Sequence, residues 1–382
     1  MWRIDTPGRV NLIGEHIDYA GLPVLPMAIE RRITLHVRRR GDGRVRLVDV
    51  GEAFGEREFA IEDSIARYPA GDWGNYARAA VHGLVDAGLR VAGFDALVAS
   101  SLPPAAGLSS SSALVVGTAL AALAAAADDG ADAMLPPADP LPLAALLARA
   151  EQYVGARGGG MDQAAILAAR ANHAMYLEFE PLRVEHIRVP PDWSFVVAHS
   201  LAAAEKSGAA REAYNARRDD VERALVTTGL ESGGYRGLLS GFAPSAIDHL
   251  AGKLPPPLQQ RFRHVTSEAG RVTRAAAALR AGDVAAFGRL MLDSHESLRT
   301  DFEVSTGTLD TLVSQSLKAG AVGARLTGAG LGGCVLALVP ADELKGFLLR
   351  LHAAFYEPRG LPSGGSHLFA VAPGPGAAVD RA

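Results

Sequence analysis

The run of four serines from Ser109 to Ser112 constrains the fold of this chain more than any other feature. It stands in the stretch LPPAAGLSSSSAL (residues 102–114), after the expected strand FDALVAS (94–100) and before the apolar helical stretch ALVVGTALAALAAAA. Serine runs are often flexible linkers, but a linker lacks such flanks. The pattern predicts that the serines begin a buried helix.

A helix start of this kind favours an anion. Backbone N–H groups without a helical partner and the positive end of the helix dipole point outward there. Gly107 allows a backbone conformation that side chains disfavour, and a serine hydroxyl can bind a metal ion held by phosphates. Because a plain helix cap needs one serine, the run predicts a phosphate cradle, with capping alone as the alternative.

Two other nucleotide-binding signatures do not apply. The chain contains no G-x-x-x-x-G-K-[ST], which excludes a P-loop. The stretch GAGLGG (328–333) matches G-x-G-x-x-G, but the apolar CVLALV that follows indicates a strand instead of the required helix. A dinucleotide-binding dehydrogenase is therefore rejected.

A second cluster, PGRVNLIGEHIDYAG, occupies residues 7–21 and contains Arg9, Glu15, His16 and Asp18. The alternative interpretation is a solvated loop, but the apolar VNLIG indicates burial nearby, where charged groups need partners or a ligand. No second histidine stands at metal-ligand spacing to His16. This mixture of donors and acceptors suits a polyhydroxylated substrate.

A third cluster, AEQYVGARGGGMDQ, contains Glu151 and Asp162. Alone, Glu151 would be a surface residue and Asp162 a helix cap. The three glycines at 158–160 change this interpretation, because they let a ligand approach the backbone closely.

Strands and helices mix without strict alternation, which predicts an α+β (mixed α/β) fold of two domains, 1–190 and 191–382. The elements expected are a hairpin at 32–50, helices at 73–88 and 142–154, a loop at 128–142, strands at 174–179 and 194–199, a helical region at 209–298, and a frayed tail at 374–382.

Composition limits the possible partners. The net charge of −4 offers no basic field for nucleic acid or an anionic membrane. The only cysteine, Cys334, excludes a disulfide framework. The N-terminus lacks a secretory pattern, and the alanine-rich run 119–127 is too short to span a bilayer. We expect a soluble cytoplasmic protein.

Together the three clusters resemble the GHMP kinases, and among them the galactokinases. GRVNLIGEHIDY is similar to the galactokinase signature, PPAAGLSSSSAL to the shared phosphate motif, and LTGAGLGGCV to the third motif. The likeness runs from residue 7 to about 377 and includes WGNY and YNARR in family order. It implies a ribosomal S5 domain 2-like domain and a ferredoxin-like domain with the active site between them. The implied reaction is ATP-dependent phosphorylation of the anomeric (C1) hydroxyl of galactose by a monomeric enzyme.

The resemblance also implies roles for individual residues, which we carry over as expectations. The catalytic residues would be Asp162 and Arg9; the sugar-binding residues Glu15, His16, Asp18, Gly159, Asp162 and Tyr214; the residues around the ATP phosphates Gly107, Leu108, Ser109, Ser110, Ser111 and Ser112; those near the adenine Trp73 and Tyr76; and the Mg²⁺ ligands Ser111 and Glu151.

Some residues depart from the galactokinase pattern. Ile17 and Ala20 stand where galactokinases usually have threonine and asparagine, and they look more like the N-acetylgalactosamine kinase branch, whereas Tyr214 looks like the galactokinase branch. We expect galactose as the substrate, with N-acetylgalactosamine or another sugar as the alternative. A non-catalytic sugar sensor is disfavoured, because Ser110, Ser111 and Asp162 are intact.

Overall fold

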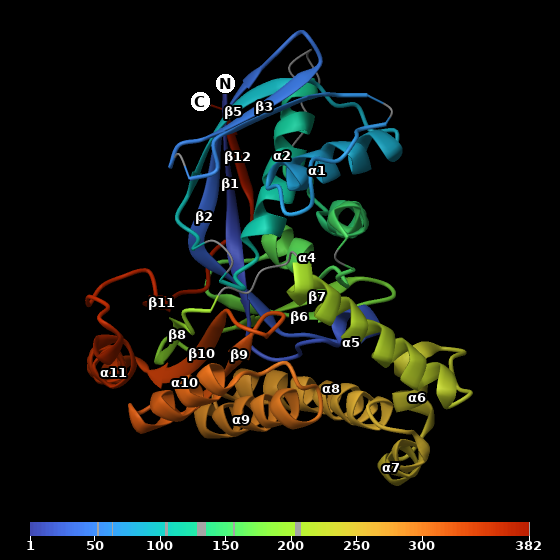
Figure 1. The fold of residues 1–382 in the computed structure, drawn as a ribbon, viewed down its shortest axis with the longest axis vertical. Coiled ribbons are helices and arrows are strands. Elements are labelled where there is room, and N and C mark those ends of the chain that lie inside the picture. Colours follow the sequence, from blue (N-terminus) through green and yellow to red (C-terminus); the bar gives the residue numbers. More distant parts are fainter. Residues whose placement is uncertain are drawn as a thin grey trace.

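The computed structural model describes residues 1–51, 53–62, 64–103, 106–127, 135–155, 157–202 and 208–381. Within them, strands form a six-stranded sheet, a four-stranded sheet and a two-stranded ribbon, and helices pack against the sheets (Figure 1). The mixed α/β fold expected from the sequence is confirmed. Of the loop expected at 128–142, residues 128–134 lie outside the described residues.

The first sheet has the strand order β12-β1-β2-β5-β3-β4. β5 pairs antiparallel with β2 on one side and parallel with β3 on the other. The hairpin expected at 32–50 is therefore wrong: β5, whose Phe94, Ala96 and Val98 are buried, lies between the two strands that would form it. The strands of this sheet are β1 (Trp2–Asn11), β2 (Pro26–Arg39), β3 (Arg44–Asp49), β4 (Glu56–Ala60), β5 (Phe94–Ser100) and β12 (Ala378–Arg381).

The end of the chain contributes the edge strand β12, which pairs antiparallel with β1 and brings the two termini close together (Figure 1). The frayed tail expected at 374–382 is therefore wrong for the residues of β12. The physical reason is that β1 would otherwise expose a row of unpaired backbone groups, which β12 satisfies.

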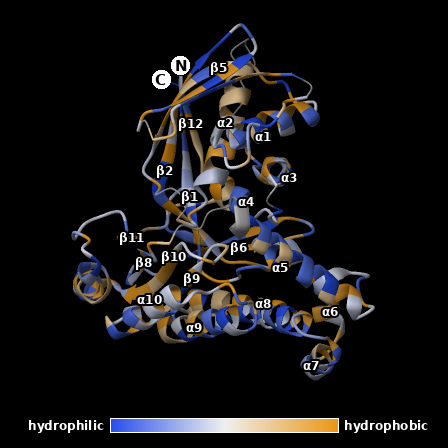
Figure 2. Cartoon of the chain, viewed as in Figure 1, coloured by the Kyte–Doolittle hydropathy of each residue, from blue (hydrophilic) through white to orange (hydrophobic). Residues whose placement is uncertain are grey.

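Helix α2 (Ser110–Ala127) forms the centre of the first sheet's helical layer. It packs on β1 and β2 and also against α1, α3 and α4. Among the described residues it is the one helix long and apolar enough to cross a membrane, yet 78% of it is buried inside the protein, as in a core helix. In Figure 2 its ribbon is coloured largely toward the hydrophobic end of the scale. The helices around it are α1 (Gly74–Asp86), α3 (Leu141–Glu151) and α4 (Met161–Ala168).

The second sheet has the order β11-β8-β10-β9, and the long helices α8 and α9 lie side by side beneath it in Figure 1. The ribbon pairs β6 (His173–Glu178) with β7 (Arg183–Arg188). The sequence analysis did not expect β7, because this strand is rich in charged residues. The remaining strands are β8 (Trp193–His199), β9 (Gly323–Thr327), β10 (Cys334–Pro340) and β11 (Leu368–Val371).

The helical region expected at 209–298 is a series of separate helices. The helices of this half are α5 (Gly208–Thr227), α6 (Gly234–Gly241), α7 (Pro244–Lys253), α8 (Leu258–Ala281), α9 (Val284–Thr300), α10 (Gly307–Lys318) and α11 (Leu344–Leu351). Short 3-10 or π turns are η1 (Asp18–Ala20), η2 (Gln152–Val154), η3 (Ala341–Glu343), η4 (His352–Tyr356) and η5 (Glu357–Arg359).

The division of the chain at residue 190 stays a prediction. The second sheet does begin just after it, with β8 at Trp193, but the topology returns 378–381 to the first sheet. A single cut therefore does not describe the sheets completely.

Candidate active site

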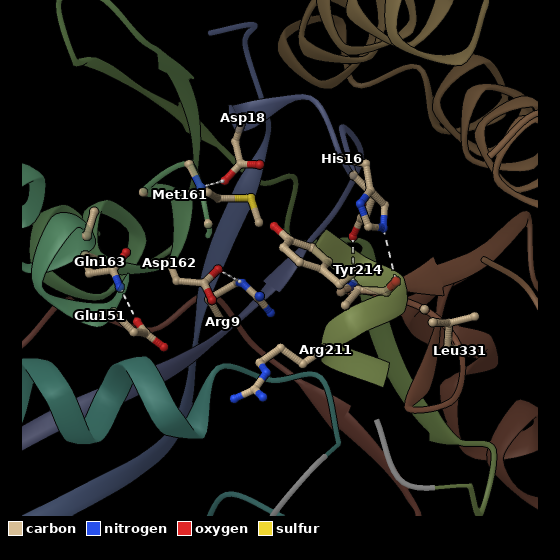
Figure 3. Close-up of a pocket in the computed structure, with 18 residues that line it drawn as sticks. Arg9, His16, Asp18, Glu151, Met161, Asp162, Gln163, Arg211, Tyr214 and Leu331 are labelled. Atoms are coloured by element: carbon tan, nitrogen blue, oxygen red, sulfur yellow. Dashed lines mark hydrogen bonds and ion pairs between the residues drawn. The ribbon is translucent and has the colours of Figure 1, made fainter. Parts of the chain in front are cut away.

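One pocket gathers the catalytic and sugar-binding residues expected from the sequence, together with Glu151 (Figure 3). It encloses about 960 Å³, part of it open to solvent. Its walls come from the loop after β1, the end of α3, the start of α4, the first turns of α5 and the loop between β9 and β10. The lining residues are Arg9, Glu15, His16, Asp18, Ala148, Glu151, Gly158, Gly159, Gly160, Met161, Asp162, Gln163, Arg211, Tyr214, Gly328, Ala329, Gly330 and Leu331.

Asp162 lies in the first turn of α4, directly after the glycine run. Gly160 takes the left-handed backbone conformation at the N-cap, with φ of 106°, which turns the chain sharply into the helix. One carboxylate oxygen of Asp162 accepts a hydrogen bond of 2.7 Å from Arg9 Nε, and the other accepts one of 2.6 Å from Ser109 Oγ. The carboxylate is thus held from two sides while it lines the pocket.

Arg9 connects Asp162 to the serine loop. Its Nη1 donates to the Gly107 carbonyl at 2.7 Å, and its backbone N–H donates to the Leu108 carbonyl at 3.1 Å. The pairing of β1 with β2 shifts register between Pro7 and Arg9, and such a bulge redirects the side chain that follows it. The loop and the carboxylate therefore share one buried guanidinium.

The serines divide into two pairs. Ser109, with φ of 59°, and Ser112 are buried and face carboxylates, because Ser112 Oγ donates to Glu151 Oε2 at 2.7 Å. Ser110 and Ser111 lie half-buried on the first turn of α2. The serine loop lies behind Asp162 and does not line the pocket itself.

Glu151 is buried at the end of α3. Its Oε2 also accepts a hydrogen bond from Gln163, a residue that the sequence analysis missed. The hydroxyl that donates to this carboxylate is that of Ser112, whereas the sequence suggested Ser111 and Glu151 as two ligands of one Mg²⁺ ion. Metal binding by Ser111 and Glu151 stays a prediction.

Asp18 and Gly159 meet in the pocket wall. The Gly159 N–H donates to Asp18 Oδ2 at 3.1 Å, and a Cβ on Gly159 would lie 2.4 Å from the backbone of both Asp18 and Tyr19. Only glycine fits there. Burial first, and then the negative charge of Asp162, raises the pKa of the Asp18 carboxyl.

His16 is a neutral imidazole in this site, because burial lowers its pKa to about 3. Its Nε2 therefore donates to the Ala329 carbonyl at 3.0 Å, and its Nδ1 accepts from the Tyr19 hydroxyl at 3.2 Å. The Tyr214 ring lies 5.5 Å from the His16 ring, centroid to centroid. Figure 3 shows both rings on the same side of the pocket.

Glu15 lines the pocket but also bonds to the second half of the chain. Its Oε1 accepts a 2.9 Å hydrogen bond from the Gly328 N–H, and its Oε2 pairs with Arg325. The glycines after β9 thus form a pocket wall, and β10 follows them as a strand, so the rejection of a dinucleotide-binding motif is confirmed.

Arg325 and Arg211 were both missed by the sequence analysis, and neither stands in a recognisable motif. Arg211 lies in the pocket wall on α5, and its Nη1 donates to the Val154 carbonyl at 3.2 Å. The sequence gives no signal for Arg211, because arginine is common on exposed helices. Arg325 is distinguished only by its complete burial in β9, which the sequence does not display.

Four further residues do not line the pocket. Trp73 and Tyr76 lie at the start of α1, where Trp73 Nε1 donates to the Phe54 carbonyl at 2.8 Å, so their contact with adenine stays a prediction. Ile17 is fully buried, and Ala20 packs against the core. Neither side chain therefore lines the pocket directly, and the influence of these two positions on the choice of sugar stays a prediction.

Comparison with known proteins agrees with this geometry. The model of the galactokinase galactose-binding signature matches residues 3–39, that of the GHMP kinase N-terminal domain matches 75–170, and that of the GHMP kinase C-terminal region matches 275–357. The fold also matches mevalonate kinase from Methanococcus jannaschii with a TM-score of 0.62 at 18% identity, over 97% of this chain and 98% of that one. Fold and motifs together define a GHMP kinase.

The more similar relatives narrow the class. The galactokinase of Roseiflexus sp. (strain RS-1) is 39% identical over 365 residues, which is 94% of this chain and 88% of the relative. The crystal structure of Lactococcus lactis galactokinase complexed with galactose matches with a TM-score of 0.85 at 31% identity, over 98% of this chain and 94% of that one. The chain belongs to the galactokinase family. The resemblance stated from the sequence is confirmed, and the protein is a sugar kinase that uses ATP as phosphate donor.

Proposed function

We propose that this enzyme transfers the γ-phosphoryl group of ATP to the anomeric hydroxyl of galactose, giving galactose 1-phosphate and ADP. The observation that carries the proposal is Asp162, held by Arg9 and Ser109 between the sugar-side pocket and the serine loop. A carboxylate in this position can accept a hydroxyl proton on one side while phosphates bind on the other. The similarity to galactokinases supports galactose as the acceptor.

The reaction needs positioning and charge neutralisation more than covalent chemistry from the protein. The anomeric oxygen forms a bond to the γ-phosphorus, the bond from that phosphorus to the ADP oxygen breaks, and the hydroxyl proton passes to Asp162. Arg9 stabilises the carboxylate charge and orients it through Nε. Asp18 and Tyr214 offer acceptors and donors to the sugar hydroxyls, and the His16 ring, whose two nitrogens are already hydrogen-bonded, lines the pocket beside them.

The polar groups near α2 fit a magnesium ion. Mg²⁺ prefers oxygen ligands and usually takes one or two carboxylates beside substrate phosphates. Among the described residues no group of three or more His, Cys, Asp or Glu stands ready to hold a metal alone, which fits an ion held largely by phosphates. Ser111 and Glu151 would hold it, and the ion would neutralise phosphate charge.

The amino-terminal end of α2 offers the phosphates the backbone N–H groups and the hydroxyls of its first turn. Arg211, in the pocket wall on α5, adds a positive charge. We further propose that the enzyme works as a cytoplasmic monomer. Size-exclusion chromatography of the purified protein tests the oligomeric state.

A panel of sugars with ATP and Mg²⁺ tests the proposal. ADP release should be fastest with galactose, and ³¹P and ¹³C NMR of the product should place the phosphate on C1. Faster turnover with N-acetylgalactosamine would identify that sugar as the preferred substrate and leave the proposed phosphoryl transfer unchanged. Sugar binding without ADP release would make the protein a sensor.

A further inference from the structure

A group of buried charges lies behind the loop from Gly14 to Asp18, which carries residues expected to bind the sugar and which we call the sugar loop. Glu15, Glu268, Arg271 and Arg325 are each at most 7% exposed. Arg325 pairs with Glu15, and Arg271 Nε pairs with Glu268 Oε2 at 2.6 Å. Because an unpaired buried charge is strongly unfavourable, two carboxylates and two guanidinium groups form a balanced set, which we call the buried quartet.

The buried quartet holds the backbone of the sugar loop as well as neutralising itself. Glu268 Oε1, on α8, accepts from the Gly14 N–H at 3.0 Å and from Ser294 Oγ at 2.6 Å. Arg325 Nη1 donates to the Asn11 carbonyl at 3.2 Å. The two ends of the turn before His16 and Asp18 are thus fixed by charged side chains from the second half of the chain.

His264 adds a further contact from the same helix. Its Nε2 lies 3.0 Å from the Glu15 carbonyl, and its Nδ1 lies 3.0 Å from Ser297 Oγ. Burial lowers the pKa of His264 to about 4, so the neutral ring donates to the carbonyl from Nε2. Gly14, with φ of 110°, leaves no room for a side chain, since a Cβ would lie 2.9 Å from Val272 on α8.

Glu268, His264 and Arg325 do not line the pocket, so any effect on catalysis must pass through the loop. We propose that these three are positioning residues that fix the loop from Gly14 to Asp18 in its sugar-binding geometry, an inference that rests on the proposed function. Helix α8 therefore sets sugar affinity without touching the sugar.

The contacts of Glu268 make a selective prediction. Among the described residues, Glu268 bonds to Gly14, Ser294 and Arg271, none of which belongs to the serine loop. Loss of the Glu268 charge should loosen the sugar loop and leave the phosphate side in place. A role in folding alone would lower the melting temperature without separating the two substrates.

The test is Glu268→Gln in the full-length enzyme, with KM for galactose, KM for ATP, kcat and Tm measured together. The expected result is a rise of about tenfold in the galactose KM, the size of one lost charge-assisted hydrogen bond, with the ATP KM changed less than about twofold. Glu185→Gln is the matched control, because Glu185 pairs with Arg280 on the same helix at an exposed site, 2.8 Å away, and should change neither constant.

Ser294→Ala is the second variant if Glu268→Gln does not fold. It removes one donor to Glu268 and leaves the quartet charges in place, so a smaller rise of about two- to threefold in galactose KM is expected. An unchanged galactose KM in the folded variants, or equal rises in both KM values, would overturn the inference. If the wild-type enzyme prefers another sugar, the proposed function is wrong but the inference is not. The KM values of the variants are then compared with that sugar in place of galactose.

Discussion

The replacement Asp162→Asn separates proton transfer from orientation at the centre of the site. Asparagine has the same shape: its oxygen can still accept from Arg9 Nε, and its NH₂ group can donate to the Ser109 hydroxyl, which lie 2.7 and 2.6 Å from the two carboxylate oxygens of Asp162. It does not accept a proton from the sugar. Because a positioned general base contributes about 10²- to 10⁴-fold, we expect kcat to fall by that factor.

The same change also costs stability, since it leaves the Arg9 guanidinium, 5% exposed, without its charged partner. Breaking a fully buried pair costs about 3–5 kcal/mol. The Asp162 side chain is 14% exposed, so solvent screening reduces the expected loss to about 1–3 kcal/mol. Kinetics must therefore be measured well below the melting temperature of the variant.

A coupled assay of ADP release gives kcat, and calorimetry with ATP gives nucleotide affinity, which should remain close to that of the wild type. Asp95→Asn is the control, because Asp95 pairs with Arg38 and Arg40 at 2.9 and 3.0 Å on β5, away from the pocket. If Asp162→Asn keeps kcat within about threefold of the wild type while Asp162→Ala does not, the carboxylate only orients the reactants, and its role as base is refuted.

Three further predictions address the metal, the sugar and pH. Ser111→Ala should lower kcat and raise the Mg²⁺ concentration for half-maximal activity by about tenfold; an unchanged Mg²⁺ titration would leave the serine run as a cap. Tyr214→Phe should shift the kcat/KM ratio about fivefold toward N-acetylgalactosamine over galactose, and an unchanged ratio would exclude the hydroxyl from C2 discrimination. The pKa of His264 is about 4 in the folded protein and near 6.5 in the unfolded chain. Between these two pH values the unfolded chain binds one proton more than the folded protein, so the free energy of unfolding decreases as pH falls from about 6.5 to about 4. Denaturation of His264→Gln from pH 6.5 to 4 should show a pH slope smaller by up to about 1.4 kcal/mol per unit, and equal slopes would show that the ring titrates normally.

The sequence predicts the local parts of this site well because each has a local physical cause. Serines between an apolar strand and an apolar helix predict the start of α2, and α2 does begin at Ser110. Three glycines before Asp162 predict a sharp turn into a helix, and Gly160 makes that turn with φ of 106°. These signals depend on neighbours along the chain, which the sequence displays directly.

Pairings across the chain were predicted poorly, because they depend on competition between segments. The strands at 26–39 and 44–49 look like a hairpin, but β5 competes for both edges and separates them. The glycine-rich tail looks frayed until β1 is known to have an open edge. Likewise, the sequence identifies four serines but not their rotation about the α2 axis, which decides that Ser112 faces Glu151.

Glu15 shows why a local motif can suggest a ligand and conceal a structural role. Its position beside His16 predicts a sugar contact, yet the Gly328 N–H and Arg325 lie at its two oxygens from more than 300 residues away. Burial raises the pKa of Glu15, and the Arg325 charge is the largest influence that opposes this rise. Since a carboxylate has about four acceptor positions, Glu15 can join the two halves of the chain and still accept from a sugar hydroxyl. The motif at residues 7–21 is therefore both a binding surface and a joint, and substitutions in it should be assayed for stability as well as for sugar affinity.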